Sequence, residues 1–201
     1  MLPRPSLSTR LRWRRRLRSL GALLLLAAMA GAVWFAQPAP TRTIPLVHII
    51  DGDSLTVTHD AAARTIRLTG LDAVEYRQDC ARADGHRWAC GHEARAALAR
   101  LAGSGPLHCA LAANDKYGRT LAACRTRPEP DGVDLATEMI RQGWAVATDD
   151  AHLPDEGEAQ LARRGIWQGD FDRPADWRAV HDRAATAVGA ATAVGAAAAD
   201  R

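Results

Sequence analysis

Three charged residues in an otherwise apolar stretch are the first candidates for chemistry. Arg67 alternates with the apolar Ile66 and Leu68, as in a strand, so its side chain leaves the core face. Asp72 and Glu75 follow, three residues apart, which lets both carboxylates border one pocket with that arginine. Such a trio is either a satisfied ion cluster or a site for a phosphate and a metal ion.

Two neighbouring stretches add residues of the same kinds. Asp51-Gly52 lies between two alternating apolar runs, which predicts a hairpin turn, and Asp53 stands just past it. Farther along, the polar turn Asn114–Arg119 separates two more apolar runs and supplies a second arginine. The chain therefore offers acids and arginines in three separate segments that its fold would have to bring together.

Taken in this order and at these separations, the motifs resemble those of the staphylococcal nuclease-like (thermonuclease) family. They are a strand, turn and strand with Asp-Gly-Asp-Ser, an Ile-Arg-Leu-x-Gly-x-Asp-x-x-Glu segment, and Asp-Lys-Tyr-Gly-Arg. The resemblance runs from about Thr43 to Trp177 and is that of a bacterial member, membrane-anchored or secreted. One such motif alone is weak, whereas three in the right order are specific.

The resemblance implies calcium-dependent hydrolysis of phosphodiesters in DNA and RNA, with low sequence specificity and 3′-phosphate products. Asp53 and Asp72 are hard oxygen ligands suited to Ca²⁺, and the resemblance adds the backbone carbonyl of Ala73. Glu75 would act as general base on the attacking water, or orient it.

The same resemblance assigns the substrate contacts. Arg67 and Arg119 would hold phosphate oxygens from two directions with planar, paired donors. Tyr117 matches a tyrosine beside the nucleotide phosphate, and Lys116 precedes it. The expected partner is a nucleic acid, and no obligate protein partner is evident.

Two other functions stay open. Ala73 and Val74 replace the family's usual threonine and proline, which is compatible with a catalytically weakened module that binds nucleic acid or protein at the cell envelope. In a purely structural envelope protein, Arg67, Asp72 and Glu75 would form only an ion cluster.

The order of patterns predicts an α+β fold. Three helices accompany a five-stranded, partly open barrel of the oligonucleotide-binding type, preceded by an N-terminal apolar helix. The expected strands lie near Thr43–Ile50, Ser54–Thr58, Thr65–Leu68, Leu107–Leu111 and Thr120–Arg125. The expected helices lie near His92–Leu101, Asp134–Gln142, with Asp134 as N-cap, and Pro154–Arg164.

The start of the chain has the pattern of an export signal or a membrane anchor. Seven arginines and no acid precede Leu20–Ala36, whose 17 uncharged residues are at the short end for a spanning helix. The expected organisation is a leader (1–36), a linker (37–42), a nuclease-like domain (43–178) and an alanine-rich tail (179–201). Because the basic residues before the apolar run stay in the cytoplasm, the rest of the chain should face outward. We therefore expect an exported protein, either periplasmic and anchored in the inner membrane by an uncleaved leader, or secreted.

Charge supports a local site over a broad basic groove. The formal net charge of +3 includes the seven leader arginines, so the rest of the chain carries −4. A mildly acidic domain holds nucleic acid through a few arginines at one phosphate rather than through extensive counterion release.

Four cysteines follow the leader, and disulfides are the default outside the cytoplasm. Cys109 and Cys124 stand on two strands that we expect to pair, and Cys80 and Cys90 would close the loop after Glu75. Sequence alone permits three pairings. A competing interpretation is a zinc site made of Cys80, His86, Cys90 and His92.

Overall fold

The computed structural model describes residues 7–35 and 40–183. The first residues of the predicted linker (37–39) and the alanine-rich tail from 184 lie outside the described residues. The chain divides into two compact units, Met1–Ala39 and Pro40–Arg201. The second contains all the predicted site residues.

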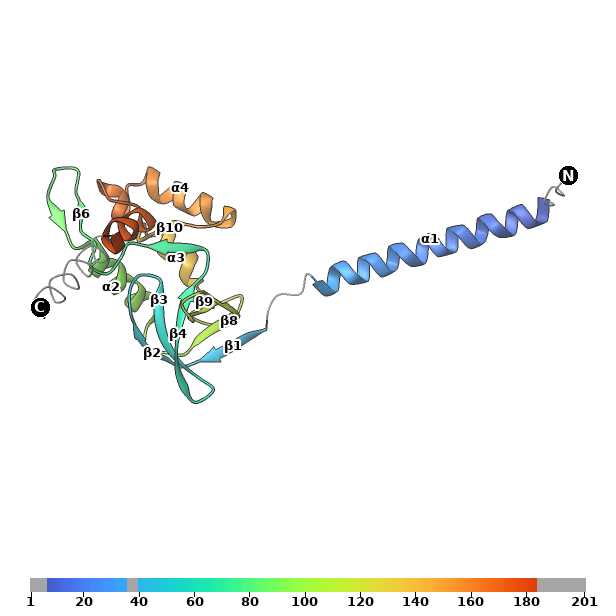
Figure 1. Cartoon of the computed structure of the whole chain (residues 1–201), viewed down its shortest axis with the longest axis horizontal. Coiled ribbons are helices and arrows are strands. Elements are labelled where there is room, and N and C mark those ends of the chain that lie inside the picture. The colour runs from blue at the N-terminus through green and yellow to red at the C-terminus, as the bar shows by residue number, and fades with distance from the viewer. Residues whose placement is uncertain (1–6, 36–39, 184–201) are drawn as a thin grey trace, which may run out of the picture. The chain divides into compact units, whose positions relative to one another are not determined.

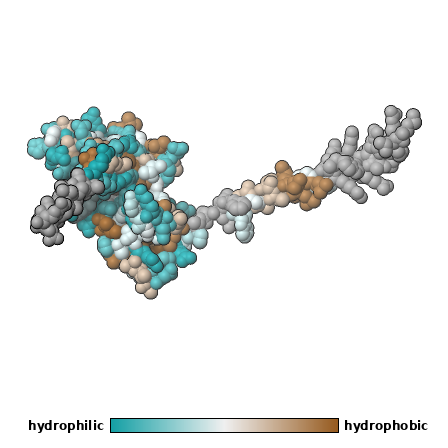
Figure 2. Space-filling view, in the orientation of Figure 1, coloured by the Kyte–Doolittle hydropathy of each residue, from teal (hydrophilic) through white to brown (hydrophobic). Residues whose placement is uncertain are grey.

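The described residues of the first unit form one long helix, α1 (Leu7–Phe35). Its apolar run is exposed, as at Leu20 and Leu23 to Leu26, and Figure 2 shows the hydrophobic stretch along the helix. No helix within residues 7–35 and 40–183 combines the length and hydropathy that crossing a membrane requires.

The main sheet of the second unit has six strands in the order β1-β8-β9-β4-β3-β2 (Figure 1). They are β1 (Thr41–Ile44), β2 (Leu46–Ile49), β3 (Ser54–His59), β4 (Ala62–Leu68), β8 (Leu107–Asn114) and β9 (Thr120–Arg125). Five strands were expected, and the sixth arises because the first expected strand, Thr43–Ile50, is interrupted at Pro45, which has no N–H to donate.

This interruption closes the sheet. Upstream of Pro45, β1 pairs with β8, and downstream of it β2 pairs with β3. The two edges of the sheet therefore belong to one continuous chain segment, and the sheet curls back on itself. All pairs are antiparallel except β4 with β9.

The pairing brings the three motifs to one region. Ser54, just after Asp53, lies opposite Arg67 in the β3–β4 pair, and Arg67 lies opposite Leu121 in the β4–β9 pair. The turn that ends at Arg119 joins β8 to β9. Register alone thus places both arginines beside the turn that carries Asp53.

The Asp51-Gly52 turn forms as predicted between β2 and β3. The Asp51 carboxylate accepts the backbone N–H groups of Asp53 and Ser54 at 3.0 and 2.7 Å. Gly52 is needed for close approach rather than for an unusual φ, because a Cβ there would lie 2.6 Å from the Cβ of Ala73. The turn therefore packs directly against the chain beside Asp72.

Three predicted helices are present as α2 (Cys90–Ala102), α3 (Leu135–Arg141) and α4 (Leu153–Leu161). Asp134 caps α3 by accepting the N–H of Thr137 at 2.9 Å, as predicted. Helix α4, the third predicted helix, ends at Leu161 rather than at the predicted Arg164, because Arg163 has a φ of +49°. Short 3₁₀ turns cover Asp150–His152 and Gly165–Gln168, and a further helix occupies 174–183.

Four short strands were not expected. Strand β4 ends at Leu68 as predicted, but β5 (Leu71–Ala73) begins directly after Gly70 and pairs with β10 (Ala145–Ala147). The others, β6 (Cys80–Ala81) and β7 (Arg87–Trp88), pair with each other. Segments of two or three residues show no alternation of apolar and polar side chains, so sequence patterns do not reveal them.

Two apolar clusters hold the unit together. The larger lies between the main sheet, α2 and α3, with Leu55, Ile66 and Met139 fully buried. The smaller surrounds the Cys80–Cys90 pair, and Trp144, Trp167 and Phe171 pack against it. These aromatics are packing residues, and they fix the chain that leads to the helix at 174–183.

Candidate active site

Arg67 joins the two aspartates that the sequence singled out. Its Nη1 donates to Asp53 Oδ1 at 2.6 Å and its Nη2 to Asp72 Oδ1 at 2.5 Å. Burial opposes the charged guanidinium, but attraction by both aspartates outweighs it and raises the pKa of Arg67. Arg67 therefore stays charged and fixes the two carboxylates side by side.

Asp53 is the most deeply buried acid of the site, with 3% of its surface exposed. Besides Arg67, its carboxylate accepts the Ser54 hydroxyl at 2.8 Å and the N–H of Ala73 at 3.0 Å. Burial raises the pKa of Asp53 to about 7 in spite of these donors. A positive charge brought close to this carboxylate would relieve that cost.

This pKa predicts how stability depends on pH. Between the ordinary value of 3.8 and about 7, the folded protein keeps a proton on Asp53 that the unfolded chain has lost. The stabilisation is complete below pH 3.8 and disappears as the pH rises through about 7. In thermal unfolding with a chelator, Asp53→Asn should gain stability relative to wild type on going from pH 4 to pH 7. A difference that is constant with pH would contradict the assignment.

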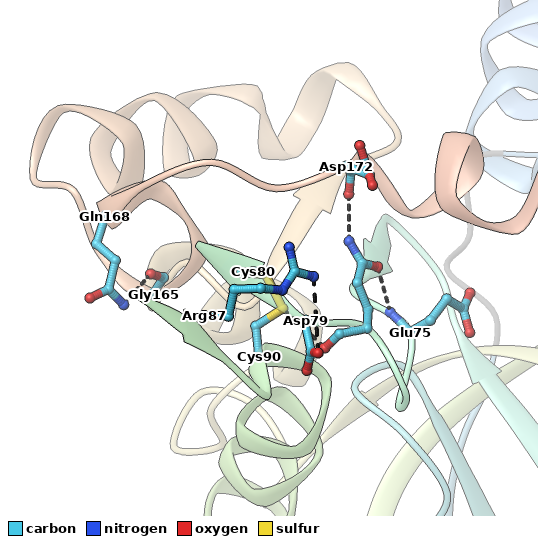
Figure 3. Close-up of a disulfide and its surroundings, with 9 residues drawn as sticks. Glu75, Asp79, Cys80, Arg87, Cys90, Gly165, Gln168 and Asp172 are labelled. Atoms are coloured by element: carbon cyan, nitrogen blue, oxygen red, sulfur yellow. Dashed lines mark hydrogen bonds and ion pairs between the residues drawn. A yellow bond between two sulfur atoms is a disulfide. The ribbon is translucent and has the colours of Figure 1, made fainter. Parts of the chain in front are cut away.

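Glu75 follows β5 in a loop that Gln78 holds in place. The fully buried Gln78 side chain accepts the N–H of Glu75 at 3.1 Å and donates to the carbonyl of Asp172 at 2.6 Å. Figure 3 shows both hydrogen bonds beside the Cys80–Cys90 disulfide. Gln78 was not predicted, and it connects the Glu75 loop to a segment almost a hundred residues away.

The same loop depends on Gly91 at the start of α2. A Cβ at Gly91 would collide with the backbone carbonyl oxygen of Glu75 and lie 2.6 Å from that of Tyr76. We therefore expect Gly91→Ala to destabilise the fold by about 1–3 kcal/mol and to displace Glu75. Calorimetric unfolding measures the first effect. Gly157→Ala, at a helical position with open space, is the matched control and should stay within about 1 kcal/mol of wild type; equal effects would contradict the account.

Arg119 is held by its own turn. The Asp115 carboxylate accepts the Arg119 Nε at 2.8 Å and its Nη2 at 2.7 Å, besides its backbone N–H. Tyr117 is exposed, with the Lys116 ammonium 4.9 Å and the Arg119 guanidinium 5.5 Å from its ring centroid. The turn therefore presents a ring and two cations that a ligand can reach.

The predicted catalytic and substrate-binding side chains meet in one pocket of about 790 Å³. Its lining consists of Asp51, Thr65, Arg67, Glu75, Lys116, Tyr117, Arg119, Arg178 and Asp182. Asp53 and Asp72 do not line it, but both bond to arginines that do. The structure thus brings together residues from every motif.

Arg178 is the one arginine of this site that the sequence did not indicate. Its Nη1 donates to Asp72 Oδ1 at 3.0 Å and to Glu75 Oε1 at 2.6 Å, and its Nη2 to Asp72 Oδ2 at 2.9 Å. An arginine in a polar C-terminal helix resembles an ordinary solvated charge, so no local signal reveals this role.

The donor set suits a hard divalent cation. Two buried carboxylates lie side by side, and burial raises the pKa of Asp53 in spite of its bond to Arg67. No group of three or more His, Cys, Asp or Glu within the described part of the chain forms a metal site by itself. A cation here would hence need Asp53, Asp72 and backbone or water oxygens, and would compete with the arginine bonds to Asp72. Ala73, whose carbonyl was predicted to help, is buried beside them.

All four cysteines form disulfides. Cys109 pairs with Cys124, as the expected strand pairing suggested, and Cys80 pairs with Cys90, which closes the loop after Glu75. The zinc interpretation is wrong, because its two cysteines are bonded to each other and His92 instead stacks on Tyr76 at 4.3 Å. The first disulfide supports the Glu75 loop, and the second fixes the strands on either side of Arg119.

Comparison with known proteins identifies the family. The family model described as "Staphylococcal nuclease homologue" matches residues 65–169, just over half of the chain. This region contains Arg67, Asp72, Glu75 and Arg119. The chain therefore belongs to the staphylococcal nuclease family.

Several curated proteins are similar over most of their length. The chain is 31% identical to "Succinoglycan biosynthesis protein ExoI" of Rhizobium meliloti (strain 1021), over 75% of this chain and 76% of that one. It is 32% identical to "Protein ParB" of Escherichia coli, over 78% and 91%. It is 29% identical to "Micrococcal nuclease" of Shigella flexneri, over 81% and 97%.

Proposed function

We propose that this protein is a calcium-dependent nuclease that hydrolyses phosphodiesters of single-stranded or loosened DNA and of RNA, with low sequence specificity. One observation carries the proposal: Arg67, Glu75 and Arg119 line a single pocket, and Arg67 is bonded to two buried aspartates. The family and the name of the Shigella flexneri relative support the same reaction. The sheet, whose two edges belong to one segment, supports the oligonucleotide-binding type of barrel.

The arginines bind and orient the phosphate. A guanidinium has five N–H donors, so Arg67 can keep both aspartates and still donate to a phosphate in the pocket. Arg119 faces the same pocket from the β8–β9 turn, and Asp115 fixes its orientation. Two fixed guanidinium groups then stabilise the negative charge that grows on the phosphate oxygens in the transition state.

Glu75 moves the proton. Its carboxylate would take a proton from water as the water oxygen bonds to phosphorus, and the bond from phosphorus to the 5′ oxygen breaks. The 5′ oxygen leaves with a proton from solvent, and the phosphate remains on the 3′ oxygen. A calcium ion held by Asp53, Asp72 and the Ala73 carbonyl would supply further positive charge beside the phosphate.

The two disulfides also support a place of action. Bonds such as Cys80–Cys90 persist in oxidising surroundings, so we place the protein outside the cytoplasm, as the arginine-rich start of the chain also suggests.

The test is cleavage of 5′-labelled single-stranded DNA by the oxidised full-length chain, with calcium or with excess chelator. The proposal predicts cleavage only with calcium, and fragments whose new 3′ ends accept a polymerase only after phosphatase treatment. Binding of DNA without cleavage at any calcium concentration would favour the weakened binding module instead.

A further inference from the structure

Arg178 binds two of the three carboxylates that the proposed reaction needs, Asp72 and Glu75. Its guanidinium spans the two oxygens of Asp72, at 3.0 and 2.9 Å, and also bonds to Glu75 at 2.6 Å. The first is a predicted cation ligand and the second the predicted base. Hydrogen bonds to Asp72, and then to Glu75, raise the pKa of Arg178, so this group is always charged.

These bonds conflict with the reaction. Asp72 cannot give both oxygens to Arg178 and also hold a cation at close range, because two positive groups would compete for one carboxylate. Arg178 also bonds to one of the two Glu75 oxygens, Oε1, so only the other oxygen can take a proton from water while this bond lasts. The bonds from Arg178 to Asp72 must therefore give way before a cation binds there.

The surroundings of Arg178 limit where its guanidinium can go. The chain before it is anchored, because Asp172 accepts a hydrogen bond from the buried Gln78 and Phe171 packs on the smaller apolar cluster. Arg173 also reaches the buried Glu156, at 3.4 Å. These contacts favour rotation of the Arg178 side chain over departure of its helix.

A rotating Arg178 side chain stays within the pocket. Arg178 already lines the same 790 Å³ pocket as Arg67 and Arg119, and about a third of its side chain is exposed. The anion expected in that volume is the phosphate of the substrate, which accepts planar paired donors as a carboxylate does.

Building on the proposed function, we propose that Arg178 is a third phosphate-binding arginine, held by Asp72 and Glu75 at rest and passed to the substrate phosphate when a divalent cation takes Asp72. The cation and Arg178 thus compete for Asp72. Cation binding in turn releases Arg178 to bind the substrate phosphate, so cation and substrate bind cooperatively. The same transfer releases Oε1 of Glu75 from its bond to Arg178.

The test compares wild type with Arg178→Gln in the full-length chain. Calorimetric titration with calcium alone should show affinity about fivefold or more higher in Arg178→Gln, because the competing charge is gone. The KM for single-stranded DNA at saturating calcium should rise about tenfold or more, because a charge-assisted contact to phosphate is lost. Arg178→Lys should recover part of the KM. Arg141→Gln removes a comparable Arg–Asp pair that does not line the pocket, and should change neither value more than twofold.

Three results would overturn the inference while leaving the nuclease intact. If Arg178→Gln binds calcium more tightly but has an unchanged KM, or cleaves DNA faster, then Arg178 only blocks cation binding at the empty site and does not bind the substrate. Unchanged calcium affinity and KM would make it an ordinary ion pair. Weaker calcium binding together with a lower melting temperature in both Arg178 variants would make it a structural clamp. A wild type that neither binds calcium nor cleaves DNA would instead refute the proposed function, and this inference with it.

Discussion

Glu75→Gln is expected to lower the rate of single-stranded DNA cleavage by about 10²–10⁴-fold, the range typical for loss of a general base. Glutamine has nearly the same size and keeps an oxygen that can accept from Arg178, but it cannot take a proton from water. The fold should therefore survive. Single-turnover rates at saturating calcium, with melting temperatures measured in parallel, separate the loss of chemistry from loss of structure.

A matched control for Glu75→Gln is Glu158→Gln. Glu158 also pairs with an arginine, Arg164, but it does not line the pocket. This variant should keep the wild-type rate within about twofold, since an exposed ion pair contributes little. If Glu75→Gln cleaves as fast as the control, Glu75 is not the base.

Arg67→Ala is expected to affect both stability and activity. Removing the guanidinium leaves Asp53 without its ion-pair partner and Asp72 with only Arg178, which should lower the free energy of unfolding by about 2–4 kcal/mol. Loss of a phosphate donor should also lower the cleavage rate by about 10²–10³-fold. Chemical denaturation and single-turnover cleavage measure the two effects.

This variant separates the nuclease from a purely structural ion cluster. In a nuclease, single-stranded DNA with calcium should raise the melting temperature of wild type, and Arg67→Ala should abolish most of that increase. In a structural protein, Arg67→Ala would lower stability equally, but the nucleic acid would protect neither form. Arg67→Lys, which keeps the charge without the paired donors, should protect weakly.

The main sheet was predictable because its strands carry long apolar alternation and clear turns. Ser54–His59 and Thr120–Arg125 lie within one residue of their predicted bounds. The interruption at Pro45 and the early start of β4 at Ala62 were not foreseen. The latter follows a tight turn at Asp60-Ala61, where both residues take positive φ, which an alanine seldom does.

The site was predictable only in part. Arg67, Asp72, Glu75 and Arg119 stand in segments whose order resembles a family, and the fold brings them to one pocket. Gln78 and Arg178 belong to no such motif. Their roles arise from contacts with residues as far as 106 positions away, which no local pattern encodes.

The second disulfide shows the same distinction. Cys109 and Cys124 were paired from adjacent strands, a short-range inference that the register explains. By contrast, no local pattern predicts the contacts of the segment from Gly165 to Phe171. Its packing against Trp144 and Val74, which places the helix at 174–183 over the site, depends on the smaller cluster as a whole.

The most direct test of the central claim is an anomalous diffraction map of the calcium-loaded protein with a non-hydrolysable dinucleotide. The account predicts one calcium peak in contact with the carboxylates of Asp53 and Asp72, and a phosphate that accepts hydrogen bonds from Arg67 and Arg119. A saturated protein with calcium bound elsewhere, or with the phosphate outside this pocket, would contradict it.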